Sequence, residues 1–155
     1  MYRKKNDPPL TPLYALGEFG LINHLTSGFS TTNPATLKGV GDDAAVLSAG
    51  DQVMLISTDL LVEGIHFDLT YTPLKHLGYK LVVVNVSDIA AMNGIPGQIT
   101  VSLAVSARFS VEALDELYKG IRLACERYGI DLIGGDTSSS VKGLLISVTD
   151  RKSVV

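Results

Sequence analysis

The alternation of hydrophobic and polar positions predicts several short strands along the chain. Residues 44–47 and 53–58 are apolar stretches bounded by turn-forming residues, which is typical of strands. Residues 99–105 alternate with the period of two that a half-buried strand requires. Residues 130–133 and 144–148 have the composition of two further short strands. Two stretches rich in Gly, Ser and Thr are expected to be loops, 27–39 and 134–140.

Three other segments show the spacing of helices. Residues 16–26 place apolar side chains three to four positions apart, which predicts a short amphipathic helix. Pro73 favours the start of a second helix that extends to about Met92. Ser110 caps a third helix, which ends at Gly129. Because strands and helices alternate, the sequence predicts an α/β (α+β) domain.

Length and composition restrict the class of protein. The chain has 155 residues, of which 46% are hydrophobic, so it can form one domain with a real core. The net charge is -3 and no block of Lys or Arg is present, so neither a nucleic-acid partner nor a membrane span is expected. A single cysteine, Cys125, favours a reducing cytoplasm. Residues 1–14 contain several prolines and are expected to form a flexible arm.

Acidic residues stand beside glycines or small hydroxyl residues where the predicted elements begin or end. Carboxylate and hydroxyl oxygens suit Mg²⁺, which also takes phosphate oxygens, and do not suit zinc. Aspartates in turns often bond only their own backbone, and that alternative remains open for Asp42, Asp43 and Asp136. The acids are Asp42, Asp43, Asp59, Asp88 and Asp136.

Asp88 is the most informative of these acids. It lies within a predicted helix that is apolar on nearly every side, where an unpaired carboxylate is costly. No Lys or Arg occurs between Lys80 and Arg108, so a local cation is missing. A bound divalent metal ion resolves the difficulty. The alternatives are a helix-end aspartate that caps a neighbouring loop and a pair with a distant lysine.

The remaining candidates point to a phosphate-bearing ligand. Gly134-Gly135-Asp136 reads either as a plain turn or as a nest of backbone N–H groups facing a phosphate. Tyr118 either stacks on a base or packs against its helix, and His66 is either a ligand or a structural histidine. A cluster of several acids repels a nucleoside triphosphate such as ATP unless two or more cations lie between them. The sequence contains no P-loop motif, so the protein is not expected to be a P-loop enzyme.

Four motifs in this order resemble the thiamine-monophosphate kinase family, part of the aminoimidazole ribonucleotide synthetase-like superfamily. They are Gly-Val-Gly-Asp-Asp-Ala-Ala-Val-Leu at 39–47, Ser-Thr-Asp-Leu-Leu-Val-Glu-Gly-Ile-His-Phe at 57–67, Asn-Val-Ser-Asp-Ile-Ala-Ala-Met at 85–92 and Leu-Ile-Gly-Gly-Asp-Thr at 132–137. The resemblance covers residues 15–149. It implies the N-terminal domain of that fold, a mixed sheet with helices on one side, and sheets joined across a homodimer.

The resemblance also implies a reaction, the ATP-dependent phosphorylation of thiamine monophosphate to thiamine diphosphate with several Mg²⁺ ions in the cytoplasm. Phosphoryl transfer is direct in this family, so no covalent nucleophile is expected. Carried over residue by residue, the metal ligands are Asp43, Ser57, Thr58, Asp59, Asp88 and Asp136. Gly135 and Asp136, with Tyr118, are expected to bind the nucleotide, and His66 to contact the thiamine substrate. Asp42 is a less certain ligand than Asp43.

The resemblance stops at Thr149, and residues 150–155 have no counterpart in the family. Their codons can match a common sequencing adapter, so we expect a non-family tail that arose by read-through. The family continues into a C-terminal domain that is absent here, so the 155-residue chain is expected to be inactive by itself. Two alternatives remain open. The chain is a non-catalytic module that binds Mg-nucleotide and dimerises, or part of another ATP-dependent synthetase of the superfamily.

Overall fold

A computed structural model describes residues 10–154 and separates the chain into two compact units, 1–32 and 33–155. Within the described part of the first unit, a short 3-10 helix, η1 (Leu13–Ala15), precedes helix α1 (Gly17–Thr26). The helix predicted over 16–26 is therefore confirmed. Residues 1–9 of the predicted flexible arm, 1–14, lie outside the described residues, and Leu13 and Tyr14 belong to η1.

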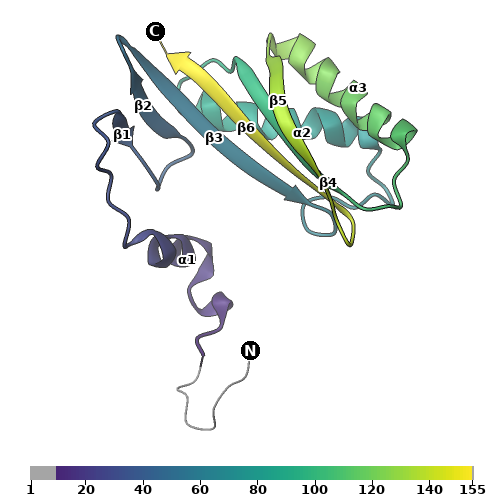
Figure 1. The fold of residues 1–155 in the computed structure, drawn as a ribbon, viewed down its shortest axis with the longest axis horizontal. Helices are drawn as coiled ribbons and strands as arrows, with labels where there is room; N and C mark the ends of the chain where they lie inside the picture. Colours follow the sequence, from purple (N-terminus) through teal and green to yellow (C-terminus); the bar gives the residue numbers. More distant parts are fainter. Residues whose placement is uncertain (1–9, 155) are drawn as a thin grey trace. The chain divides into compact units, whose positions relative to one another are not determined.

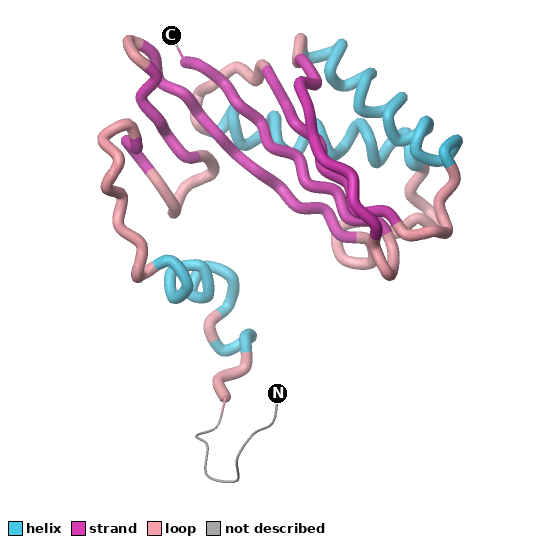
Figure 2. Tube along the Cα trace, in the orientation of Figure 1, coloured by secondary structure: helices cyan, strands magenta, loops and turns pink. Residues whose placement is uncertain are grey.

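The second unit is a six-stranded mixed sheet with two helices on one of its faces (Figure 1). The order across the sheet is β1-β2-β3-β6-β4-β5, and only β4 and β5 run parallel. Helices α2 and α3 cover the same face of the sheet, as Figure 2 also shows. The predicted mixed sheet with helices on one side is confirmed. The elements are β1 (Thr36–Lys38), β2 (Ala45–Ala49), β3 (Gln52–Val62), α2 (Leu74–Ala91), β4 (Gln98–Val105), α3 (Val111–Tyr128), β5 (Asp131–Ser139) and β6 (Leu144–Val154).

The helix ends follow from local chemistry. The Ser110 hydroxyl accepts a hydrogen bond from the Ala113 N–H at 3.3 Å and so caps α3. Gly129 ends α3 in a left-handed conformation with φ of 66°. After α2, Asn93 takes the corresponding conformation with φ of 57°, which asparagine tolerates better than most residues. No helix among the described residues has the length and apolar character to cross a membrane.

Helices α2 and α3 pack with their backbones in direct contact at two glycines. A Cβ on Gly78 of α2 would lie 1.9 Å from the Leu117 carbonyl oxygen of α3. A Cβ on Gly120 of α3 would lie 1.9 Å from the Lys75 carbonyl oxygen of α2. Only glycine therefore fits at either position, and the two helices form one compact layer.

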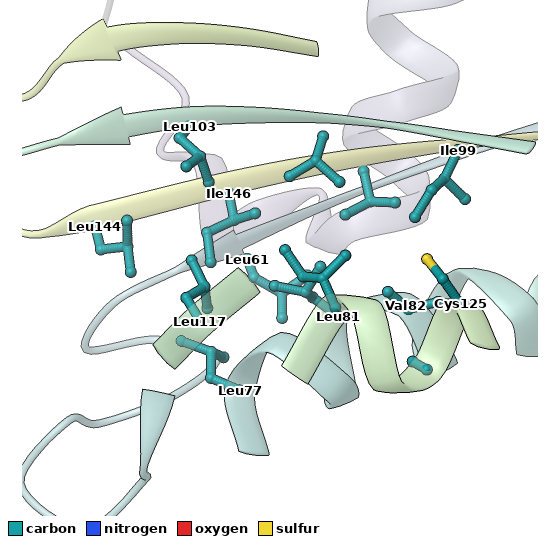
Figure 3. Packing of buried hydrophobic residues seen from close by; sticks show 14 of the residues in the cluster. Leu61, Leu77, Leu81, Val82, Ile99, Leu103, Leu117, Cys125, Leu144 and Ile146 are labelled. Carbon is teal, nitrogen blue, oxygen red and sulfur yellow. The ribbon is translucent and has the colours of Figure 1, made fainter. Parts of the chain in front are cut away.

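The main core lies between this helix layer and the sheet (Figure 3). Strand β6 supplies Leu144, Ile146 and Val148, which are fully buried and alternate with less buried residues. Helix α2 supplies Leu77 and Leu81, also fully buried. The hydrophobic alternation along β6 thus fixes which face of the strand meets the helices.

Four sequence-based boundaries are wrong. Strand β3 extends to Val62, so Asp59 lies inside the strand and not at its end. Residues 134–139 belong to β5 and are not a loop, because their backbone groups form hydrogen bonds with β4. Gly is depleted in strands, so the composition of this segment alone does not predict a strand. Strand β1 lies within the predicted loop 27–39. Strand β6 continues beyond Val148 to Val154 and pairs with both β3 and β4.

The continuation of β6 buries one acid, Asp150. Its position follows Leu144, Ile146 and Val148 in the strand alternation, so its side chain lies on the helix-covered face and is 0% exposed. Neither carboxylate oxygen makes a hydrogen bond of good geometry, although the N–H groups of Gly97 and Arg151 lie near and offset part of the penalty. Burial raises the pKa of Asp150 to about 6.

We expect Asp150→Val to stabilise the protein by about 3 kcal/mol near pH 7.5, as a shift of about two pKa units corresponds to that free energy. The folded state holds the Asp150 proton more tightly than the unfolded state, whose pKa is near 3.8. The wild type therefore loses stability as pH rises from about 4 to about 6, and the gain from valine shrinks toward pH 4. Urea unfolding at both pH values measures this. The control Asp131→Asn, at an exposed position of β5, should change little; a loss of stability in Asp150→Val at pH 7.5 would contradict the prediction.

Candidate functional site

Ser57 connects two of the predicted ligand residues. Its hydroxyl lies 3.0 Å from the Asp88 Oδ2 atom on α2 and 3.0 Å from the Asp43 backbone carbonyl oxygen before β2. The hydroxyl has one proton, so it donates to one of these acceptors at a time. Strand β3, helix α2 and the 39–44 segment therefore meet at Ser57, which is 5% exposed.

Asp59 lies two residues further along β3 and therefore on the same face as Ser57. Partial burial, followed by the negative charge of Asp88, raises the pKa of Asp59, and His66 partly offsets this. Asp88 and His66 therefore both lie near enough to Asp59 to change its pKa. Two carboxyl groups that repel each other in this way form a site that a cation would stabilise.

His66 stands in a turn directly after β3. The Val62 N–H donates to His66 Nδ1 at 3.0 Å, so the neutral ring carries its proton on Nε2. The Lys80 ammonium of α2 donates to the His66 carbonyl oxygen at 3.0 Å. The side chain of His66 is exposed, and its ring is thus oriented by the turn but remains accessible to a ligand.

Thr58 does not lie with its neighbours Ser57 and Asp59. Its hydroxyl donates to the Val148 carbonyl oxygen at 3.1 Å and accepts from the Thr149 hydroxyl at 3.0 Å. Strand alternation puts the Thr58 side chain on the sheet face opposite to the helices. A shared ion beside Asp59 can therefore meet only the backbone of Thr58 within one chain.

The predicted nucleotide-binding residues line one hollow at the edge of the sheet. This hollow, of about 480 Å³, lies between α3 and β5 and is lined by Tyr118, Gly135 and Asp136 together with Leu132 and Thr137. Gly135 is not part of a backbone nest, since it pairs with Val101 inside the sheet. A Cβ at Gly135 would lie 1.8 Å from the Val101 carbonyl oxygen, so the strands approach too closely for any side chain.

Asp136 and Asp59 stand on strands that are three places apart in the sheet. Three interstrand spacings amount to roughly 14 Å, which is too far for one Mg²⁺ to bind both carboxylates of the same chain. Within residues 10–154, no group of three or more His, Cys, Asp or Glu side chains is arranged to hold a metal ion. The donors that do gather, the Asp59 and Asp88 carboxylates and the Ser57 hydroxyl, fit a hard cation that takes its other ligands from water and phosphate.

Two expectations about individual acids need correction or refinement. Asp88 is only half-buried and accepts a hydrogen bond from Ser57, so the prediction of an unpaired carboxylate in a helix buried on nearly every side is wrong. Ser87, Ala90 and Ala91 beside it are exposed, so this end of α2 is more open than the apolar sequence indicates. Asp42 is exposed and paired with Lys38, which lowers its pKa, in keeping with its weaker candidacy.

Sequence analysis missed the function of two charged residues near His66. Lys80 and Glu63 had the character of solvated side chains, yet both make hydrogen bonds to backbone groups around the turn at 62–67. Glu63 lies within the 57–67 motif and Lys80 lies before the 85–92 motif, but neither gave a signal, since their hydrogen-bond partners, Leu144 and His66, are distant in sequence.

Comparisons with known proteins identify the family to which the sequence and the fold are similar. Residues 41–150 match the model of a family described as AIR synthase related protein, N-terminal domain. The thiamine-monophosphate kinase of Bacillus subtilis is 40% identical over 136 residues, which is 86% of this chain and 41% of that protein. The chain thus spans about two fifths of the length of this curated relative.

Two solved structures share the fold at useful sequence identity. The structure of AaThiL complexed with AMPPCP and TMP has a TM-score of 0.82 and 32% identity, and the match covers 94% of this chain and 44% of that one. The thiamine monophosphate kinase of Aquifex aeolicus has a TM-score of 0.74 and 30% identity, with 93% and 44% coverage.

Proposed function

The chain belongs to the AIR synthase related protein family through its match to the N-terminal domain, and we propose that it is the nucleotide- and metal-binding half of a thiamine-monophosphate kinase. The enzyme would transfer the γ-phosphoryl group of ATP to the phosphate of thiamine monophosphate. The observation that carries the proposal is the hydrogen bond between Ser57 and Asp88, with Asp59 on the same face of β3 as Ser57, in a chain whose relatives bear that name.

The two ends of the nucleotide have distinct candidate positions. Tyr118 offers an aromatic face in the hollow beside β5, and the backbone of Gly135 lines the same hollow. Asp136 stands at the same hollow as a ligand for an ion that accompanies the phosphates. AaThiL, one of the similar structures, holds AMPPCP, an analogue of ATP.

The second group of residues would hold the reacting phosphates. Asp43, Ser57, Asp59 and Asp88 would bind Mg²⁺ there, with Thr58 contributing from its backbone. Bound Mg²⁺ supplies neutralisation of the charge that builds up on the transferred group. His66, whose ring proton is on Nε2, would donate a hydrogen bond to the thiamine substrate. Transfer is direct, so the chain supplies positioning rather than a covalent nucleophile.

We also propose that two chains join their sheets on the face opposite to α2 and α3. On that face Leu60 is 54% exposed, whereas Leu61, its neighbour on the helix side, is 4% exposed. A second sheet packed on this face would cover the Leu60 side chain. The enzyme would work in the cytoplasm, where reducing conditions keep its single cysteine as a free thiol and where ATP is available.

A second candidate function is a non-catalytic module that binds Mg-nucleotide and dimerises. The coverage is compatible with this candidate, because the match spans about two fifths of the curated relative. Another ATP-dependent synthetase of the superfamily is the third candidate. The turn that carries His66 favours the kinase over that synthetase, because its sequence matches the kinase motif.

A coupled assay of ADP release with thiamine monophosphate separates these candidates. We expect little or no turnover from the 155-residue chain and clear turnover from the longer parent protein that adds the remaining domain. Full turnover by the short chain would show that our assignment of the missing half is wrong. If the parent protein binds Mg-ATP but releases no ADP when thiamine monophosphate is added, the kinase is excluded and another synthetase is favoured.

A further inference from the structure

The carboxylate of Glu63 connects three separate parts of the second unit. Its Oε1 atom accepts a hydrogen bond from Arg108 in the β4–α3 loop, forming an ion pair. Its Oε2 atom accepts from the Leu144 N–H at the start of β6 at 2.9 Å. The Glu63 side chain is only 17% exposed, so these contacts are partly shielded from water. Hydrogen bonds to a charged group in such surroundings are stronger than those on an open surface.

Both partners of Glu63 are themselves held in place. The Arg108 guanidinium lies 4.9 Å from the centre of the Phe109 ring, which packs against the main core. The β5–β6 loop reaches Glu63 closely at Gly143, where a Cβ would lie 3.0 Å from Glu63 Oε2. Gly143 also has a φ of 70°, so the loop depends on glycine twice over. The Glu63 carboxylate is therefore held by a largely shielded backbone contact at Leu144 and by an Arg108 side chain that is 54% exposed.

Glu63 is also the first residue of the turn that carries His66. The Gly64 N–H donates to the Phe67 carbonyl oxygen at 2.8 Å, and the His66 N–H donates to the Val62 carbonyl oxygen at 2.9 Å. Phe67 closes the turn and is buried in the core. The backbone of Glu63 is paired on both sides, with Phe67 and with Leu144. Fixing Glu63 thus fixes the backbone from which the His66 ring projects.

We propose that Glu63 is a positioning residue, which with Arg108 holds the 62–67 turn so that His66 faces the thiamine-bearing substrate. The inference rests on the proposed function for the role of His66 as a substrate contact. Glu63 itself touches no reacting atom. Lys80, which bonds the His66 carbonyl oxygen from α2, supports the turn from the other side.

The first test is nitrogen NMR of the His66 ring in the full 155-residue chain. When the ring is neutral, the wild type is expected to give the signals of the tautomer protonated on Nε2, because Nδ1 accepts from the Val62 N–H. Glu63→Gln keeps the shape but loses the charged pair, so the two ring nitrogens should shift toward averaged values. Arg108→Gln should shift them in the same direction, since it breaks the same pair. Glu126→Gln, at an exposed position of α3, is the control and should leave the signals unchanged.

The second test uses the longer parent protein and thiamine monophosphate. Glu63→Gln should raise the KM for thiamine monophosphate about tenfold, with a smaller change in kcat and in the KM for ATP. Unchanged His66 signals and an unchanged KM in Glu63→Gln would overturn the inference. A wild-type parent without thiamine-dependent turnover would overturn the proposed function instead, while the NMR comparison would still decide whether Glu63 orients His66.

Discussion

Replacing Asp88 with asparagine is expected to weaken Mg²⁺-dependent binding of ATP by the chain by up to about 100-fold, because the side chain loses the charge that attracts the ion. The amide remains able to accept a hydrogen bond from Ser57, so the local geometry is retained. Removal of the Asp88 charge also lowers the repulsion that raises the pKa of Asp59. The metal-free protein should therefore be as stable as the wild type or slightly more stable.

Calorimetric titration of ATP with and without Mg²⁺ measures this effect. The matched control is Asp115→Asn, which removes the same charge from an exposed position of α3. Binding without added Mg²⁺ should be equally weak for all three proteins. If Asp88→Asn raises stability and leaves Mg²⁺-dependent binding intact, Asp88 is only an unfavourably placed acid and the metal assignment fails.

The second large effect is expected at the contact between α2 and α3. Gly120→Ala should destabilise the protein by about 3 kcal/mol or more and lower the unfolding midpoint by roughly 10 °C, because the new methyl group would lie 1.9 Å from the Lys75 carbonyl oxygen. Alanine has the higher helix propensity, so local preference alone predicts the opposite sign. Gly78→Ala should behave in the same way, since its methyl group would meet Leu117.

Thermal unfolding followed by circular dichroism distinguishes packing from propensity. Gly134→Ala serves as the control, because its nearest neighbour, a methyl group of Thr100, would be 3.9 Å from the added Cβ. That variant should unfold close to the wild-type temperature. An unchanged or raised midpoint in Gly120→Ala would mean that the two helices are further apart than described.

The local elements could be predicted from sequence where the chemistry is itself local. The cap of α3 at Ser110, its end at Gly129 and the period of β4 depend on residues within a few positions of one another. The fold class followed from the order of these elements. The motifs that carry Asp88 and His66 were likewise recognisable as short runs of residues.

Strand β5 shows where such reasoning ends. Its Gly, Thr and Ser residues favour a loop when considered alone, and only pairing with β4 makes them a strand. The same pairing requires Gly135 for close approach rather than for a backbone nest. Asp150 is a comparable case, because no local signal shows that β6 carries it into the buried face.

The sequence by itself determined the kinds of atom available for chemistry: carboxylates and hydroxyls in fixed motifs, with one histidine beside them. Tertiary structure decided which of these atoms meet, since that depends on strand order and on the face each side chain takes. Ser57 and Asp59 lie on the sheet face that α2 covers, and Ser57 contacts Asp88 there. The Thr58 side chain lies on the opposite face, and Asp136 is on a strand three places away in the sheet. Contacts between residues far apart in the chain, such as Glu63 with Arg108, are set by packing of whole elements, and no short stretch of sequence encodes them.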